Sequence, residues 1–236
     1  MHNIAQQNFE HHLRQNPYPG RGLVVGRGDD GAWLILYWIM GRSVNSRNRQ
    51  FVADGSTLRT EPLNPSLLAD PSLIIYEAML DLTGTYLVSN GDQTRTVYAA
   101  LQAGGSLDGA LQTREREPDA PNYTPRISAM LRPAGPHPLT LSLLKANLLD
   151  PAHTDRFTYR PAVPPPGYGY GLTTYMGDGS PLPSFSGDPL LLPLLGTPQQ
   201  LLAAYWDALD PENRIALAMK RIAEGEVMLW LKNKGD

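Results

Sequence analysis

The amino-acid sequence predicts an α+β protein in which antiparallel sheets are covered by helices. Short β-rich runs come in pairs separated by tight-turn residues, and segments with helical periodicity form pairs of their own. A doubly wound fold would instead alternate strands and helices along the chain, and that alternation is missing. With 236 residues the chain is long enough for one large hydrophobic core, and we expect a single domain over residues 1–236.

The first part of the chain is predicted to hold an N-terminal helix or arm followed by three β-hairpins. The polar residues 3–16 form the helix or arm, which ends at Pro17 because proline cannot continue a helix. Turn signals such as Asp-Gly then separate runs rich in β-branched and aromatic residues. The predicted strands are residues 22–26 with 32–40, 51–53 with 57–59, and 72–79 with 85–89.

The middle of the chain changes period and is predicted to be helical. Residues 94–103 and 107–116 show helical periodicity, two glycines stand between them, and Ser106 is a typical helix N-cap. Strand-like runs return at residues 127–131 and 139–148, joined by a proline-rich connection. We therefore expect a pair of helices that covers one sheet.

The last third combines predicted loops with two predicted helices. Residues 161–170 are rich in proline, glycine and tyrosine and are predicted to form a stiff surface loop, and residues 171–187 an irregular one. The capping box Thr-Pro-Gln-Gln opens a helix over residues 197–209. A second helix is expected over residues 210–225, followed by a closing strand over residues 226–231.

Composition excludes several classes of protein. Apolar residues make up 42% and charged residues 18% of the chain, which rules out a disordered chain and a coiled coil. The net charge of −3 and the pI near 5.9 argue against a general nucleic-acid or membrane-surface binder. No apolar run approaches about 18 residues and no signal-peptide pattern is present, so we expect a soluble, cytoplasmic protein.

Common catalytic and cofactor motifs are missing from the sequence. The chain has no cysteine, which excludes disulfides, thiolate metal sites and a cysteine nucleophile. Its five histidines show no metal-ligand spacing, and three of them belong to an N-terminal segment that we expect to be frayed. Phosphate-loop, dinucleotide-binding and nucleophile-elbow patterns are absent as well.

Arginine dominates the basic residues, with 16 Arg against 4 Lys, and its planar guanidinium suits phosphate or carboxylate. The densest group is Arg42, Arg47 and Arg49, which also has two hydroxyls and two amides around it. No acidic residue occurs between Ala32 and Ala53, so each guanidinium needs an anionic partner from elsewhere. A solvated basic turn is the plain alternative; we favour an anion site, with phosphate as the anion.

Two further polar segments and one tyrosine are candidates for a site. Residues 114–126 run from a charged helix end into the extended stretch Asn-Tyr-Thr-Pro-Arg, which is either a structural loop or a functional one. Residues 89–94 turn a strand into a helix, where Asn90 either supports the turn or presents its amide to a polar ligand. Tyr76 interrupts an apolar strand, a position where a tyrosine usually belongs to the core.

Four short blocks of the chain are shared, in order, with one known family. They are Tyr18-Pro19-Gly20-Arg21-Gly22, Gly41-Arg42-Ser43 with Ser46-Arg47-Asn48-Arg49, Ser89-Asn90-Gly91, and Glu117 followed by Asn122-Tyr123-Thr124-Pro125-Arg126-Ile127. Tyr76 precedes the Asn-Gly turn, where the family has a site tyrosine. The chain thereby resembles the archaeal-type IMP cyclohydrolase family over roughly residues 15–205, and residues 171–187 and the C-terminal helices look like its bacterial branch.

The resemblance implies a four-layer α-β-β-α sandwich like that of the N-terminal-nucleophile hydrolases, without their autoprocessing. It also implies the family's reaction, which closes the purine ring of 5-formamidoimidazole-4-carboxamide ribonucleotide to give inosine monophosphate and water. Holding both reacting groups of one substrate together supplies much of the acceleration, and we expect no metal and no cofactor. The implied partner is a purine nucleotide, with no nucleic acid and no membrane, and we expect a homo-oligomer.

The resemblance also gives roles to the residues that match the family's blocks. Glu117 is the implied general acid/base, and we expect its carboxylate at the edge of a cleft. Tyr76 and Arg47 are the implied proton donor and electrostatic stabiliser near the formyl group. The implied phosphate and ribose contacts are Arg21, Arg42, Ser43 and Arg126, and the implied base-edge contacts are Asn90 and Asn122.

Two other functions stay open from the sequence. A purine-nucleotide-binding protein of the same fold would keep the arginines but would not need Glu117. An amidohydrolase of the N-terminal-nucleophile type would need a serine, threonine or cysteine exposed at a mature N-terminus, and no processing site suggests itself.

Overall fold

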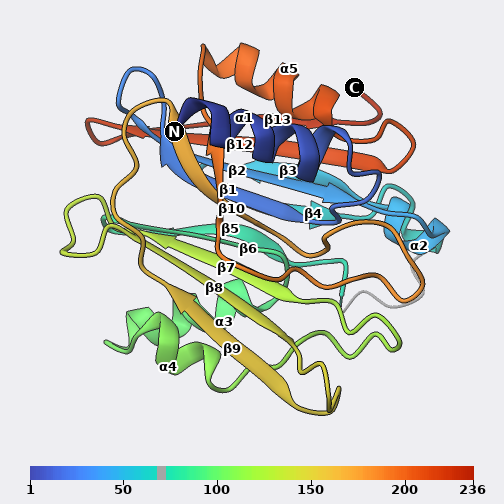
Figure 1. Cartoon of the computed structure of the whole chain (residues 1–236). Coiled ribbons are helices and arrows are strands. Elements are labelled where there is room, and N and C mark those ends of the chain that lie inside the picture. The colour runs from blue at the N-terminus through green and yellow to red at the C-terminus, as the bar shows by residue number, and fades with distance from the viewer. Residues whose placement is uncertain (68–72) are drawn as a thin grey trace.

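Two antiparallel sheets lie face to face at the centre of the molecule, and helices cover their outer faces (Figure 1). The computed structural model describes residues 1–67 and 73–236. Within these residues the first sheet has six strands and the second has seven. The α+β class predicted from the paired strands is therefore confirmed.

The six-stranded sheet is built around the first predicted hairpin, which forms as expected from its turn residues. β1 (Gly22–Arg27) and β2 (Trp33–Met40) pair in antiparallel fashion, and strands from the last third of the chain extend the sheet on both sides. The added strands are β10 (Tyr168–Thr173) and β11 (Leu190–Pro193) beside β1, and β12 (Arg214–Ala223) and β13 (Glu226–Asn233) beside β2.

The seven-stranded sheet follows the order of the chain, because each strand pairs with the next one. Its strands are β3 (Gln50–Asp54), β4 (Thr57–Glu61), β5 (Glu77–Leu82), β6 (Thr85–Ser89), β7 (Arg126–Leu131), β8 (Leu139–Ala146) and β9 (Thr154–Tyr159). The third predicted hairpin forms, but its first strand begins at Glu77, and the predicted start at Ser72 lies outside the described residues.

Helices from the two ends of the chain cover the six-stranded sheet. α1 (His2–Phe9), which continues as a π-helical turn (Glu10–Arg14), packs on β11, and α5 (Pro198–Ala208) packs on β12. The expectation of a frayed N-terminus is wrong, because Ala5, Phe9 and Leu13 lie on one buried face. The predicted capping box at the start of α5 is confirmed.

A second pair of helices covers the outer face of the seven-stranded sheet. α3 (Gln93–Gln102) and α4 (Leu107–Leu111) bury Val97 and Leu111 against the sheet residues Leu87, Met130 and Leu144. Ser106 caps α4 as predicted, but α4 ends at Leu111 and not at Arg116. Among the described residues, no helix is long and apolar enough to cross a membrane.

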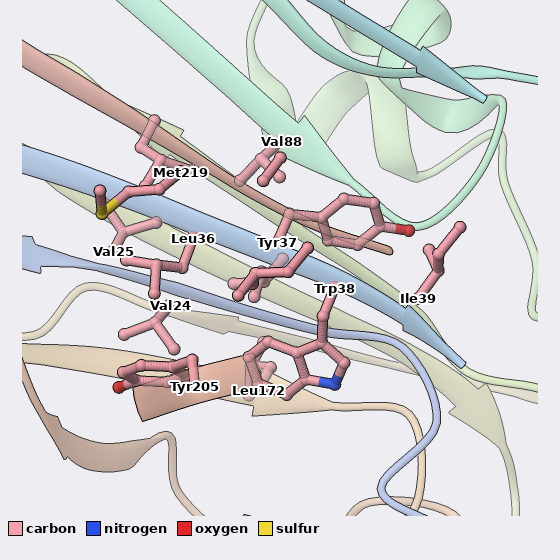
Figure 2. Packing of buried hydrophobic residues seen from close by; sticks show 14 of the residues in the cluster. Val24, Val25, Leu36, Tyr37, Trp38, Ile39, Val88, Leu172, Tyr205 and Met219 are labelled. Atoms are coloured by element: carbon pink, nitrogen blue, oxygen red, sulfur yellow. The ribbon is translucent and has the colours of Figure 1, made fainter. Parts of the chain in front are cut away.

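The main core lies on both faces of β2, which explains why its apolar run is continuous and does not alternate. Figure 2 shows Tyr37 and Trp38 on opposite sides of this strand. Tyr37 packs near Val88 of the second sheet, whereas the Trp38 ring lies 6.3 Å from that of Tyr205 in α5. One strand thereby joins the two sheets and the outer helix in a single apolar cluster.

The predicted helix over residues 210–225 is wrong, because this segment forms strand β12, which lies between β2 and β13. Its Ile-Ala-Leu-Ala-Met sequence consists largely of good helix formers. Residues 215–220 are buried between β2 and β13, and that packing outweighs the local preference.

The glycine–tyrosine run predicted as a surface loop also forms a strand, β10, which pairs with both β1 and β11. A β-carbon at Gly171 would lie 2.7 Å from the side chain of Leu192, so the glycine leaves room for that leucine. The segment that follows is not simply a surface loop, since Tyr175 and Phe185 are buried. β9, in which half of the residues are exposed, was not predicted.

A buried ion pair crosses between the sheets at Lys220 and Asp81. Lys220 lies on β12, is fully buried and donates to the Asp81 carboxylate on β5. Burial lowers the pKa of Lys220, and the Asp81 carboxylate opposes that effect. The second carboxylate oxygen of Asp81 is buried without a hydrogen-bond partner in the described residues.

Removing one partner of this pair should be costly. Lys220→Ala leaves the Asp81 carboxylate unpaired between the sheets, and we expect a loss of about 3–5 kcal/mol in the free energy of unfolding. The double variant Lys220→Met with Asp81→Leu removes both charges, so most of that loss should be regained. Urea unfolding measures all three proteins, and a double variant no more stable than Lys220→Ala would contradict this account.

Candidate active site

A cleft of about 350 Å³ opens at one end of the two sheets, where several connections meet. This volume lies in the range of small-molecule sites. Its lining includes Arg21 just before β1, Arg42 just after β2, Glu117 in the segment before β7, and Tyr175 just after β10. Segments distant in the sequence therefore meet, because the strand ends to which they are attached lie at the same end of the two sheets.

A buried ion pair between Arg21 and Glu117 forms part of the cleft lining. Nη2 of Arg21 donates to Oε2 of Glu117 over 2.8 Å, and Nη1 donates to the backbone oxygen of Asn90 over 2.7 Å. Gly20 turns the chain into this position with φ of +71°, and a β-carbon there would lie 2.1 Å from the Thr174 hydroxyl. Arg21 is therefore held by the turn before it and by its two acceptors.

Glu117 is buried, with 2% of its surface exposed, so the expectation that it lies at the edge of the cleft is wrong. Burial raises the pKa of this carboxyl group above its usual value, and the charges of Arg21 and Arg126 oppose that effect. Oε1 has no hydrogen-bond partner in the described residues. The carboxyl group thus has one oxygen fixed by Arg21 and one buried oxygen whose hydrogen-bonding capacity is unused in the described residues.

A hydrogen-bonded chain of three side chains forms the wall beside Glu117. Asp119 accepts a 2.7 Å hydrogen bond from the backbone nitrogen of Thr124 and a second one from the Thr124 hydroxyl. The Thr124 and Tyr175 hydroxyls are 2.5 Å apart, and burial raises the pKa of Tyr175. Asp119 and Tyr175 were not predicted as cleft residues. The position of Asp119, between Glu117 and the Asn-Tyr-Thr run, was a signal that could have identified it.

Arg42 lies at the more exposed part of the cleft, and its guanidinium already has partners within the protein. Its guanidinium pairs with Asp178 and lies 4.8 Å from the centre of the Tyr18 ring. Tyr18 in turn stacks on Tyr175, with ring centres 5.9 Å apart. The arginine predicted to bind an anion is therefore positioned by an aromatic pair and by a partly exposed carboxylate.

The polar loop after β2 contains a single helical turn, α2 (Val44–Arg47). Ser43 caps it and exchanges hydrogen bonds with Ser46, so both hydroxyls are used within the loop. Ser43 still lines the cleft, whereas Arg47 points elsewhere and donates to the Gly41 oxygen and to Asn213. The three arginines of this loop thus have different surroundings.

Five of the nine residues predicted for the site line the cleft together, and four do not. The five are Arg21, Arg42, Ser43, Glu117 and Asn122, and the four are Arg47, Tyr76, Asn90 and Arg126. Asn122 accepts a hydrogen bond from the Leu182 backbone nitrogen over 3.0 Å. The cleft lining also includes Tyr18, Asn45 and Arg49, which were not among the predicted residues.

The four remaining residues make contacts within the protein. The Tyr76 hydroxyl lies 2.6 Å from that of the buried Tyr37. The Asn90 amide donates to the Pro125 oxygen and accepts from the Ile127 nitrogen, and Arg126 donates to Asp92. Their direct roles in a reaction stay predictions.

The cleft offers a carboxyl group and several cationic or phenolic donors. Within residues 1–67 and 73–236, no three His, Asp or Glu side chains gather in a way that could hold a metal ion. Glu117 is suited to take or give a proton, and the guanidiniums of Arg21 and Arg42 are suited to stabilise negative charge.

The fold and the cleft define a class, namely α+β proteins with an arginine-lined small-molecule site at one end of two packed sheets. The family model described as "IMP cyclohydrolase-like protein" matches residues 18–226, and the chain belongs to this family. IMP cyclohydrolase of Methanothrix thermoacetophila is 33% identical over 92 residues, which cover 39% of this chain and 45% of that protein. The chain thus aligns with less than half of that relative's length, and the predicted family is confirmed.

The acceptor role of Asp119 can be tested by stability. Asp119→Ala removes the charged acceptor of two Thr124 hydrogen bonds, and we expect a loss of about 1.5–3 kcal/mol in unfolding free energy. Asp178→Ala is the matched control, because its pair with Arg42 is partly exposed and should contribute less than about 1 kcal/mol. Equal losses in urea unfolding would mean that the Asp119 contacts do not organise this wall.

Proposed function

We propose that this protein closes the purine ring of 5-formamidoimidazole-4-carboxamide ribonucleotide, giving inosine monophosphate and water. Membership of the IMP cyclohydrolase-like family and the identity with a protein named IMP cyclohydrolase support this proposal. The observation that carries it is the buried Glu117 carboxyl group, which has one oxygen held by Arg21 and the other without a partner in the described part of the chain.

The reaction needs proton transfer and orientation within a single substrate. The carboxamide nitrogen bonds to the formyl carbon and gives up a proton, while the formyl oxygen gains one and becomes a hydroxyl. That hydroxyl then leaves as water, and the formamide nitrogen loses its proton as a carbon–nitrogen double bond forms. A carboxyl group that can accept and return a proton serves both steps. In this proposal Glu117 is that group.

The residues around Glu117 would orient the substrate. Arg21 fixes one carboxylate oxygen, and the other is proposed to meet the reacting atoms, while Arg42 and Asn122 are proposed to contact the ligand from the cleft wall. Ser43, Arg126 and Asn90 remain proposed contacts, and Tyr76 and Arg47 remain the proposed donor and stabiliser near the formyl group. Four of these residues do not line the cleft, so they would need to act through neighbouring residues or after a shift on ligand binding: Arg47, Tyr76, Asn90 and Arg126.

Several coarser features belong to the same proposal. We propose that the layers form the α-β-β-α sandwich of the N-terminal-nucleophile hydrolases, without autoprocessing, and that residues 1–236 make up one domain. The layer order of helices, two sheets and helices supports the comparison (Figure 1). A cytoplasmic homo-oligomer that acts on a purine nucleotide without a cofactor completes the proposal.

The decisive substitution is Glu117→Gln, which keeps the shape of the side chain but cannot exchange a proton at useful pH. We expect kcat for ring closure to fall by about 10²–10⁴-fold, while inosine monophosphate still binds within a few-fold of wild type. An ultraviolet assay of ring closure and calorimetric titration of the product measure the two quantities. Glu115→Gln, an exposed carboxyl group two residues away, is the matched control and should leave both unchanged.

Three results would contradict parts of this proposal. Unchanged turnover in Glu117→Gln would remove this residue from the mechanism. A wild-type protein that binds inosine monophosphate but does not close the ring would be a nucleotide-binding protein of the same fold. Lost product binding in Glu117→Gln would mean that the carboxyl group serves binding or folding and not proton transfer.

The pH dependence of kcat/KM should report the Glu117–Arg21 pair. If the carboxylate must accept a proton, activity falls as the pH drops through the pKa of Glu117, which burial places above the usual carboxyl value. Arg21→Met removes a charge that favours the carboxylate, so the acid limb of the profile should move to higher pH. Arg21→Lys keeps that charge and should move the acid limb less. Identical pH profiles for wild type, Arg21→Met and Arg21→Lys would refute the coupling between Arg21 and Glu117.

A further inference from the structure

Three arginines line the cleft, but only two of them have a carboxylate partner in the described residues. Arg21 pairs with Glu117 and Arg42 pairs with Asp178. Within residues 1–67 and 73–236, no carboxylate oxygen lies within 4.0 Å of the Arg49 guanidinium. Arg49 is also one of the most buried charged residues, with 4% of its surface exposed.

The hydrogen bonds of Arg49 leave much of its guanidinium unused. Nη2 donates to the backbone oxygen of Met40 over 2.9 Å. Nε is buried and has no partner in the described part of the chain. A buried cation in this state is unfavourable unless an anion compensates it, and a guanidinium presents paired donors that match a phosphate group.

Arg49 occupies a wall shared by two cavities. On one side it lines the cleft with Glu117 and Arg42. On the other side it lines a pocket of about 470 Å³ that also contains Arg47, Arg214 and Lys234. That pocket also contains Glu212 and Asp236, but no carboxylate oxygen of either lies within 4.0 Å of the Arg49 guanidinium. Among the described residues nothing behind Arg49 pairs with its charge, so we expect the compensating anion on the cleft side, from its ligand.

Arg42 is less suited to be the main anion contact. Its guanidinium is more than one-third exposed, pairs with Asp178 and stacks over Tyr18. An ion pair between partly exposed groups is weak, and an incoming anion would also meet the Asp178 carboxylate. Arg49 is buried and meets no such competitor among the described residues.

We propose that Arg49 is the phosphate anchor of this cleft and that it takes the phosphomonoester of the bound ribonucleotide as its counter-charge. The nucleotide's identity rests on the proposed function, whereas the preference for a phosphate group rests on Arg49 itself. This assignment makes Arg49 a specificity-determining residue that distinguishes nucleotides from nucleosides. It replaces Arg42 as the principal phosphate contact.

The test compares Arg49→Met with the matched control Arg42→Met. Calorimetric titration with inosine monophosphate and with inosine gives the ratio of the two affinities for each protein. We expect Arg49→Met to bind inosine monophosphate about 10–100-fold more weakly than wild type, the scale of a charge-assisted hydrogen bond, and to bind inosine within about threefold. Arg42→Met should change the nucleotide-to-nucleoside ratio much less.

Thermal melting gives an independent readout that separates an anion site from a structural arginine. In phosphate-free buffer, Arg49→Met should melt at or above the wild-type temperature, because an uncompensated buried charge has been removed. Added inorganic phosphate should raise the Tm of the wild type and not that of Arg49→Met. A clearly lower Tm for Arg49→Met without phosphate would overturn the proposal, because it would show that the arginine supports the fold.

Arg49→Lys keeps the inference testable if the methionine variant does not fold. It retains the charge but not the planar fork, so its nucleotide-to-nucleoside ratio should lie below that of wild type. An unchanged ratio in every Arg49 variant that folds, or a larger drop in Arg42→Met, would refute the assignment. Phosphate-dependent binding through Arg49 in a protein that does not close the ring would contradict the proposed reaction alone, so the two failures are distinguishable.

Discussion

The contact between Arg21 and Glu117 is the constraint on which the rest of the cleft depends. Two opposite charges are taken out of water there, which is costly unless further hydrogen bonds satisfy the remaining polar atoms. On the Arg21 side the Asn90 backbone oxygen supplies one such bond, whereas Oε1 of Glu117 has no partner in the described residues. Asn90 is itself fixed to the start of β7 through Pro125 and Ile127. A predicted ligand contact is thus part of the frame that holds the ion pair.

The rigid frame comes from the apolar core between the sheets. β2 is buried on both faces, so its side chains fill the space between the second sheet and the outer helix (Figure 2). A polar ligand cannot enter that core, and the cleft therefore lies at the end of the sheets, where the connecting segments supply polar side chains. Deeper between the sheets, the buried charge of Lys220 is paired with Asp81.

The balance of charge in the cleft gives the site its chemical character. Carboxylates match Arg21 and Arg42, while Arg49 has none within reach in the described residues. A ligand that carries a phosphate at one end and a neutral, reactive heterocycle at the other complements this distribution. Oε1 of Glu117 has no hydrogen-bond partner in the described residues, which is why we propose this carboxyl group for proton transfer. Asp119, Thr124 and Tyr175 keep the neighbouring wall in place.

Local sequence was enough to determine the hairpins and the capping of α4 and α5, because turn residues and helix caps act over a few neighbouring positions. The resemblance to the family, and not local physics, brought Arg21, Arg42, Glu117 and Asn122 together, and the structure places all four in one cleft. The burial of Glu117 could not be predicted from the sequence, because it results from segments that meet only where the two sheets end.

Tertiary structure alone decided the strands β10 and β12 and the contact of Tyr76 with Tyr37. β12 carries helix-forming residues, but neighbours on both sides complete its backbone hydrogen bonds and bury its side chains. Tyr175 reaches Thr124 across 51 positions of the chain, and Tyr76 reaches Tyr37 across 39. Contacts between such distant residues depend on strand order, and local periodicity carries no information about that order.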